Sequence, residues 1–564
     1  MREIFVRLTA CGLVGAMCLP GVAQTGVTRM KRAKAGRVVA ESKLSREVEA
    51  LLADPKVMRA HWGVYVTGLD GAPIYGRNEG QYFQPASNAK LFTTAAAMAL
   101  LGGSATFETK VVGSGVWTGT ENLKGDLVLV GGGDANLSGR TIPYVSPKDM
   151  PKLPPPAAPA LRYLEELADQ VVKSGLKVVN GDVVGDDTLF PWEPYPEDWT
   201  IDDTVWGYGA PVSALTVNDN QLVVKVAPAD VAGKPAVVTI DPSVPYYTVQ
   251  LEAMTGAAKS GSHVQMERQL GSKVLRIYGS IGVDASPDVE EVAIHDPAGY
   301  AAMALKVLLE ARGVLVTGVA RAKHVAAVET RGFVEVTHEP VAQMAQSGTG
   351  YFAHGKGLTS TGCDHCDSRI LPKEVVLASR ASVTVAEDVA VTNKVSQNLH
   401  AELLLHQLAV TLGSDGSTLQ GARVVRSFLT TRVGVDADDY AFFDGSGLSG
   451  HDLVTPRATA RLLQYAAMDP KTKTAQPWFA DWKKSLPVGG EDGSLAGRFP
   501  KAPLSGHVFA KTGTLGEARA LSGYMECASG KTVVFSIMVG NHAPRSSADR
   551  DAMDRIVVAI AASN

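Results

Sequence analysis

The sequence predicts one α/β domain that is built from both ends of the chain and interrupted by a large β-rich insertion. Two observations support this prediction. Long helical patterns of apolar residues and extended strands lie toward the two ends, whereas the middle of the chain consists of short strands separated by turns. No repeat period divides the chain.

The overall composition is that of a folded protein. The chain has 564 residues, enough for about three to four domains. Hydrophobic residues make up 45% and charged residues 20%, so a wholly disordered chain is excluded. The 54 basic and 58 acidic residues give a net charge of −4, and without a basic excess no nucleic-acid partner is expected. Five cysteines in a chain of this length exclude a small disulfide-stapled scaffold.

The first 23 residues have the layout of a secretory signal peptide. Arg2 and Arg7 form a positive region, residues 8–19 are almost wholly apolar, and Gly21-Val22-Ala23 offers small residues for cleavage. The alternative is an N-terminal core helix. No later segment has the roughly 18 uninterrupted apolar residues that a membrane helix needs, so no integral membrane anchor is expected. We expect an exported protein, periplasmic or otherwise secreted.

The chain begins after this leader with a helix, a hairpin and a second helix. Apolar residues recur at helical spacing over residues 41–52. Asp70-Gly71 lies between two short β-patterned runs, which is a strong hairpin signal. The segment from Ser87 to Leu101 is apolar nearly all round, so we expect a buried helix that ends at Gly102-Gly103.

From about residue 107 the pattern changes to short strands and turns, and residues 217–290 look entirely β-structured. We expect surface loops at 151–159 and 346–367, and a helix at 300–312. The elements expected after the insertion are a helix at 399–412, an antiparallel meander with strands at 507–515, 520–527 and 532–539, and a closing helix at 549–562.

The domain boundaries follow from these changes of pattern. We assign residues 41–106 and 383–564 to the α/β domain, residues 107–216 and 291–382 to an inserted domain, and residues 217–290 to a nested β-rich domain.

Three cysteines would remain after export. Cys363-Asp364-His365-Cys366 favours a local disulfide over half of a zinc site, because no second C-x-x-C follows. Cys527 lies in an apolar strand pattern and is expected to be a buried thiol. We therefore expect neither a metal nor another cofactor.

The first candidate for chemistry is Ser87-Asn88-Ala89-Lys90, at the start of the buried helix. Side chains at i and i+3 share a helix face, and a lysine in apolar surroundings can lose its proton near neutral pH. Lys90 could then act as general base for Ser87. The motif is short and occurs by chance, as its second copy from Ser174 to Lys177 shows. That copy precedes a strand, where the geometry is wrong.

Two further motifs raise the specificity of the first. Ser396-Gln397-Asn398 is the only Ser-x-Asn in the chain and opens a helix. Lys511-Thr512-Gly513 is the only Lys-Thr-Gly and lies on a predicted strand. The three motifs in this order, each on its appropriate element, form a much more specific set than any one of them.

This set resembles the penicillin-recognising serine enzymes, and in particular the class C low-molecular-mass penicillin-binding proteins. The separation of 309 positions between Ser87 and Ser396 matches the large insertion of that D-Ala-D-Ala carboxypeptidase/endopeptidase family. Two positions depart from its usual pattern, since Gly450 and Asp452 stand where the family has an arginine and an asparagine. Further stretches similar to the family are Gly125-Asp126, Gly131 to Asp134, Ala210 to Leu215 with Asn218 and Asn220, Asp444 to Ser449, and Ala520 to Tyr524.

The resemblance implies a transpeptidase/β-lactamase-like fold with an antiparallel sheet flanked by helices, and a catalytic mechanism. Ser87 would attack the carbonyl between two D-alanines and form an acyl-enzyme, with Lys90 taking its proton. Ser396 would relay a proton to the leaving amine, and Asn398 would hold the peptide amide and the lysine.

The resemblance also implies the substrate-binding residues. Lys511 and Thr512 would bind the terminal carboxylate as a cation and a hydroxyl donor. Gly513 would let the substrate backbone lie close to the strand, and the backbone N–H groups of Ser87 and Thr514 would form the oxyanion hole. The expected partners are peptidoglycan stem peptides and β-lactams, and contacts with other cell-wall proteins are a further expectation.

Two other functions remain open from the sequence. A β-lactamase-type hydrolase would share the three motifs, and a non-catalytic peptidoglycan-binding scaffold would typically have lost one of them. His400, Glu402 and His406 do not have the spacing of a zinc-binding H-E-x-x-H motif, and Glu402 is expected on the exposed side of its helix.

Overall fold

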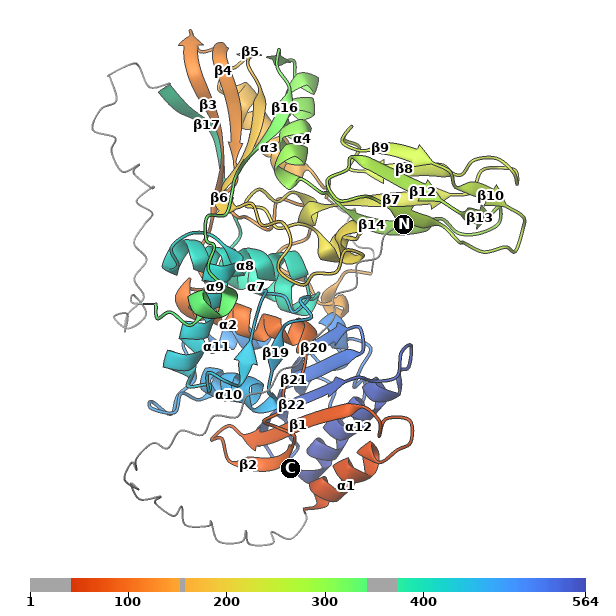
Figure 1. Ribbon diagram of the computed structural model, residues 1–564, viewed down its shortest axis with the longest axis vertical. Helices are drawn as coiled ribbons and strands as arrows, with labels where there is room; N and C mark the ends of the chain where they lie inside the picture. Colours follow the sequence, from red (N-terminus) through yellow and green to blue (C-terminus); the bar gives the residue numbers. More distant parts are fainter. Residues whose placement is uncertain (1–41, 153–157, 342–372) are drawn as a thin grey trace, which may run out of the picture. The chain divides into compact units, whose positions relative to one another are not determined.

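Both ends of the chain contribute to one antiparallel sheet. The computed structural model describes residues 42–152, 158–341 and 373–564. Figure 1 shows β1 and β22 side by side although they lie at opposite ends of the sequence. The predicted hairpin is confirmed by the antiparallel pairing of strands 61–68 and 73–77, and the predicted meander by the pairing of strands 508–515, 518–526 and 532–540. In the order in which they pair, the strands are β2 (Pro73–Arg77), β1 (His61–Gly68), β22 (Thr532–Gly540), β21 (Ala518–Glu526) and β20 (Val508–Leu515).

Helices cover both faces of this sheet. On one face α1 (Lys43–Leu52) and α12 (Ala548–Ser563) pack against each other and share a core with the strands. The other face carries the core around α2 (Ala89–Leu100), which is buried along nearly its whole length as predicted. The remaining helices of this part are α7 (Val385–Lys394), α8 (Asn398–Leu412), α9 (Thr418–Phe428), α10 (Pro456–Ala467) and α11 (Phe479–Ser485).

A separate seven-stranded mixed sheet forms most of the insertion. Helices α3 (Arg162–Lys173) and α4 (Pro297–Ala311) share a core with it, and α3 is a helix that the sequence analysis did not predict. Within the described residues, no strand of the insertion pairs with the five-stranded sheet. The strands are β3 (Glu108–Thr118), β4 (Asn122–Val130), β5 (Val178–Asn180), β6 (Val183–Pro191), β15 (Leu315–Val316), β16 (Ala320–Val325) and β17 (Lys373–Ala381).

The segment predicted to be entirely β-structured forms three small sheets around its own core. Their strands are β7 (Gln221–Ala227), β8 (Val237–Asp241), β9 (Thr248–Leu251), β10 (Met254–Gly256), β11 (Gln265–Glu267), β12 (Val274–Tyr278), β13 (Ser280–Gly282) and β14 (Asp288–Ala293).

Several predictions lie outside the described residues, among them the leader at 1–23, the loop at 346–367 and the Cys363–Cys366 pair. Cys527 is a buried free thiol, as predicted. In the part of the chain that the structure describes, no helix is long and apolar enough to cross a membrane, and no group of side chains is arranged to hold a metal ion.

Candidate active site

The nucleophile and base predicted from the sequence lie in contact. Ser87 is in a single 3-10 turn, η1 (Ala86–Asn88), directly before α2, and its side chain is partly accessible. Lys90 is fully buried one turn later, and its Nζ donates to Ser87 Oγ over 2.9 Å. Burial lowers the pKa of Lys90 to about 8, against the opposing effect of nearby carboxyl groups. The lysine is therefore close to the ionisation state that a general base requires.

The Ser-x-Asn motif joins α7 to α8 and reaches the same lysine. Lys90 Nζ donates to Asn398 Oδ1 over 2.6 Å and to the Ser446 carbonyl over 2.8 Å. The other end of the Asn398 amide donates to the Tyr208 carbonyl over 2.9 Å, so one of its two N–H bonds is already used by the protein. Ser396 has a φ of 63°, a left-handed conformation that non-glycine residues rarely adopt.

The Lys-Thr-Gly motif lies on β20, the edge strand of the sheet. Lys511 is fully buried, and its Nζ donates to Ser396 Oγ over 2.8 Å. Burial and the neighbouring Lys90 lower the pKa of Lys511 well below its usual value. Thr512 Oγ1 lies 2.7 Å from Ser494 Oγ, on a short turn that the sequence analysis did not connect with the site.

The structure gives a reason for glycine at position 513 that the sequence did not show. A Cβ at this position would lie 2.6 Å from the Pro85 carbonyl and 3.1 Å from the Ser87 nitrogen. Glycine is thus required for β20 to pack against the turn that carries Ser87. Thr514, the next residue, is exposed on the edge strand.

Comparison with known proteins places this arrangement in a family. Residues 44–344 and 367–561 match the model of the D-Ala-D-Ala carboxypeptidase 3 (S13) family. The chain belongs to this family. Together with the serine and lysine in contact, the match makes it a serine-type D-Ala-D-Ala carboxypeptidase.

Relatives of this S13 enzyme match over most of their length. It is 31% identical to the D-alanyl-D-alanine carboxypeptidase of Actinomadura sp. (strain R39), over 91% of this chain and 84% of the relative. It is 23% identical to the DacB carboxypeptidase of Haemophilus influenzae, over 81% and 80%. The crystal structure of penicillin binding protein 4 from H. influenzae has the same fold, with a TM-score of 0.70 at 20% identity, covering 91% of this chain and 98% of that one.

Three buried carboxyl groups lie near Lys90 in this S13 enzyme. Glu402 is fully buried, so the expectation that it lies on an exposed helix face was wrong, because α8 is buried on every side from Leu399 to Ala409. The Oε2 atom of Glu402 accepts the Gly445 N–H over 2.9 Å. Burial, and to a lesser degree the negative charge of Asp444, raises the pKa of Glu402 to about 8. Asp444 accepts the backbone N–H groups of Gly447, Leu448 and Ser449 and so fixes the turn beside Lys90.

Asp452, one of the two positions at which the sequence resemblance is interrupted, is a buried carboxyl group. Its Oδ1 accepts the Phe443 N–H over 2.6 Å, and burial together with adjacent Asp444 raises its pKa well above the usual value. Its other oxygen, Oδ2, is buried and makes no hydrogen bond within the described residues. The raised pKa favours the neutral, protonated form of Asp452.

The second departure lines a cavity beyond the end of β20. The cavity has a volume of about 640 Å³ and is bordered by Gly450, the second position at which the sequence resemblance is interrupted. Asp198, Asp203 and Glu517 contribute carboxylates, and no lysine or arginine is found among the described residues that line it. The cavity therefore has an acidic wall.

Proposed function

We propose that this enzyme cleaves the D-Ala-D-Ala end of peptidoglycan stem peptides, and the equivalent crosslink, through an acyl-enzyme on Ser87. The observation that carries the proposal is the 2.9 Å contact between Ser87 Oγ and the buried Nζ of Lys90. A lysine with a pKa of about 8 is partly neutral near physiological pH, which an exposed lysine is not.

The acylation step follows from these positions. Neutral Lys90 removes the Ser87 proton as Oγ attacks the carbonyl carbon, and the bond between Oγ and carbon forms. The backbone N–H groups of Ser87 and Thr514 stabilise the oxyanion. When the C–N bond breaks, Ser396 gives its hydroxyl proton to the leaving D-alanine amine and takes up the proton held by Lys90, which becomes neutral again. Asn398 keeps the lysine in place through its 2.6 Å contact.

Substrate recognition combines a carboxylate subsite with an acidic cavity. The terminal carboxylate accepts hydrogen bonds from the hydroxyls of Thr512 and Ser494, which lie 2.7 Å apart. Lys511 contacts Ser396 and supplies positive charge when protonated. The acidic wall beyond β20 favours a substrate with a positively charged group.

Labelling with penicillin tests this function. Ser87→Ala should abolish the covalent adduct seen by intact-mass spectrometry, while Ser174→Ala should keep it. Ser174 is a matched control because it is in the same four-residue motif, yet its Oγ donates to the Val171 carbonyl and its lysine, Lys177, pairs with Glu121 at the surface. Loss of the adduct in the Ser174 variant alone would overturn the assignment. Rapid penicillin turnover without an adduct would support a β-lactamase, and inertness a scaffold.

We propose further that the enzyme acts outside the cytoplasm, in the periplasm or an equivalent compartment, because its substrate is there and residues 1–23 have the pattern of a signal peptide. Edman sequencing of the protein from the extracytoplasmic fraction should begin just after Ala23; recovery of the full-length chain only from the cytoplasm would contradict this.

A further inference from the structure

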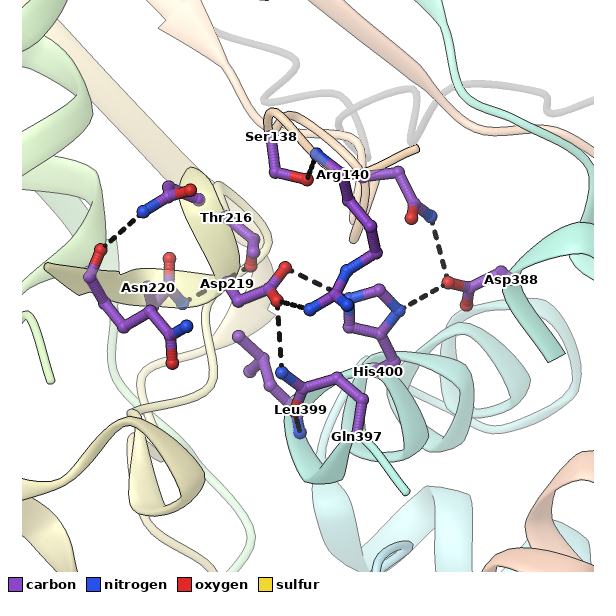
Figure 2. Close-up of polar contacts among 12 residues, drawn as sticks. Ser138, Arg140, Thr216, Asp219, Asn220, Asp388, Gln397, Leu399 and His400 are labelled. Atoms are coloured by element: carbon purple, nitrogen blue, oxygen red, sulfur yellow. Dashed lines mark hydrogen bonds and ion pairs between the residues drawn. The ribbon is translucent and has the colours of Figure 1, made fainter. Parts of the chain in front are cut away.

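A fully buried histidine on α8 joins the Ser-x-Asn motif to the insertion. His400 lies two residues after Asn398 and is completely excluded from solvent. Its Nδ1 is 2.7 Å from Asp388 Oδ1 on α7, and its Nε2 is 3.3 Å from Asp219 Oδ1 on the turn that leads into β7 (Figure 2). Because both ring nitrogens face carboxylate oxygens, only the doubly protonated imidazolium donates to both.

The Asp219 carboxylate reaches the motif by a second route. Its Oδ2 pairs with Arg140 and also accepts Gln397 Nε2 over 3.2 Å (Figure 2). Gln397 is the middle residue of Ser-x-Asn, and its Oε1 caps α8 by accepting a backbone N–H of the first turn. The buried charges of Asp219 and Asp388 are thus balanced by His400 and Arg140, as buried ions require.

The turn that carries Asp219 has an energetically unfavourable backbone conformation. Asn218, Asp219 and Asn220 have φ values of 51°, 54° and 54°, so three consecutive non-glycine residues are left-handed. Asparagine and aspartate tolerate this conformation best, yet a run of three persists only where the surrounding structure enforces it. The side-chain amides of the two asparagines each donate to a main-chain carbonyl, over 2.8 and 2.9 Å, and hold the turn. In this turn the Asp219 carboxylate is buried and faces His400 on α8.

We infer that His400 and Asp219 are positioning residues whose ion pair holds this turn against the start of α8 and thereby fixes Ser396 and Asn398 for proton transfer. The inference rests on the proposed roles of Ser396 and Asn398 in acyl transfer. A displacement of about 1 Å in a catalytic group can cost about a hundredfold in rate. Asn398 contacts Lys90 at 2.6 Å, and a shift of the first turn of α8 would lengthen this contact directly.

Asp219→Asn tests the inference because it keeps the shape of the side chain and removes its charge. We expect acylation by benzylpenicillin and kcat on a D-Ala-D-Ala peptide to fall about tenfold, with KM changed less than about threefold. The matched control is Asp439→Asn, since Asp439 is also buried and pairs with Arg457 over 2.6 and 2.7 Å. Within the described residues this pair makes no hydrogen bond to the three motifs. The control should lose thermal stability and keep its acylation rate within about twofold.

Two results would refute the inference. One is a loss of thermal stability in both variants with acylation intact, and the other is a raised KM with unchanged kcat in Asp219→Asn. If Asp219→Asn does not fold, Arg140→Met provides the second test. Arg140 is partly exposed, and its removal takes away one of the positive charges that pair with the Asp219 carboxylate. Arg140→Met should slow acylation about threefold or more, and a wild-type rate would contradict the inference. Failure of the wild-type protein to be acylated at Ser87 would instead refute the proposed function.

Discussion

Raising the pH from 7 to 9 should accelerate acylation about tenfold, because the proposed base is the neutral form of Lys90. Its pKa of about 8 results from burial, partly offset by the carboxyl groups behind it. With that pKa, roughly one molecule in eleven carries neutral Lys90 at pH 7 and roughly ten in eleven at pH 9. A lysine that stays charged throughout this range, as an exposed one does, would give less than one per cent of the neutral form at pH 7.

The measurement is the second-order rate constant of penicillin acylation under single-turnover conditions, taken between pH 6.5 and 9.5 by rapid quench and intact-mass spectrometry. Lys90→Arg is the control, because a guanidinium stays protonated and cannot act as a base. This variant should not be acylated at any of these pH values. A rate that is flat or falling across pH 7 to 9 would refute the assignment of Lys90 as base.

Three further predictions follow from the same contacts. Glu402→Gln should move the midpoint of this pH profile downward by roughly half to one unit. The reason is that an ionised Glu402 carboxylate favours the charged form of Lys90. An upward shift, or none, would contradict this prediction. Ser494→Ala should lower kcat/KM about threefold to tenfold on a peptide with a free terminal carboxylate and little on the corresponding amide, as Thr512→Ala should; equal losses on both substrates would exclude carboxylate binding. Burial lowers the pKa of His400, but the carboxylates of Asp388 and Asp219 outweigh burial and raise this pKa to about 9. The ion pairs of His400 therefore stabilise the fold fully below about pH 6.5, and this stabilisation is lost as the pH rises through about 9. Calorimetry from pH 7 to 10 should show a steeper fall of the melting temperature in the wild type than in His400→Gln.

The catalytic sheet was predictable because its signals are local. Asp70-Gly71 specifies a hairpin within a few residues, and the three strands of the meander alternate along one short segment. The helix α3 was missed because its apolar face is distributed over a charged stretch beside a proline-rich loop. Its four core residues become recognisable as a helix face only when the mixed sheet is present to receive them.

The site was predictable where the residues form motifs and not where they act through distant partners. Ser87 and Lys90 share a helix face by spacing alone, whereas Asn398 reaches the same lysine across 308 positions and was assigned only from the resemblance. Glu402 looked exposed because sequence spacing does not show what later packs over a helix. Asp219 had no signal of its own, because its importance depends on a backbone conformation and on a histidine that lies 181 residues away.

The electrostatics of the site explain why an anionic substrate suits it. Lys90 and Lys511 are both fully buried, and each proton on one disfavours a proton on the other. The carboxylates near Lys90 compensate it, but Lys511 contacts a hydroxyl and a main-chain carbonyl, and no ion pair to it occurs in the described part of the chain. A terminal carboxylate bound beside Thr512 would supply the missing counter-charge and raise the pKa of Lys511. Binding of such a substrate would then draw a proton onto Lys511 while leaving Lys90 free to act as the base, which separates the two roles of two lysines that are otherwise chemically alike.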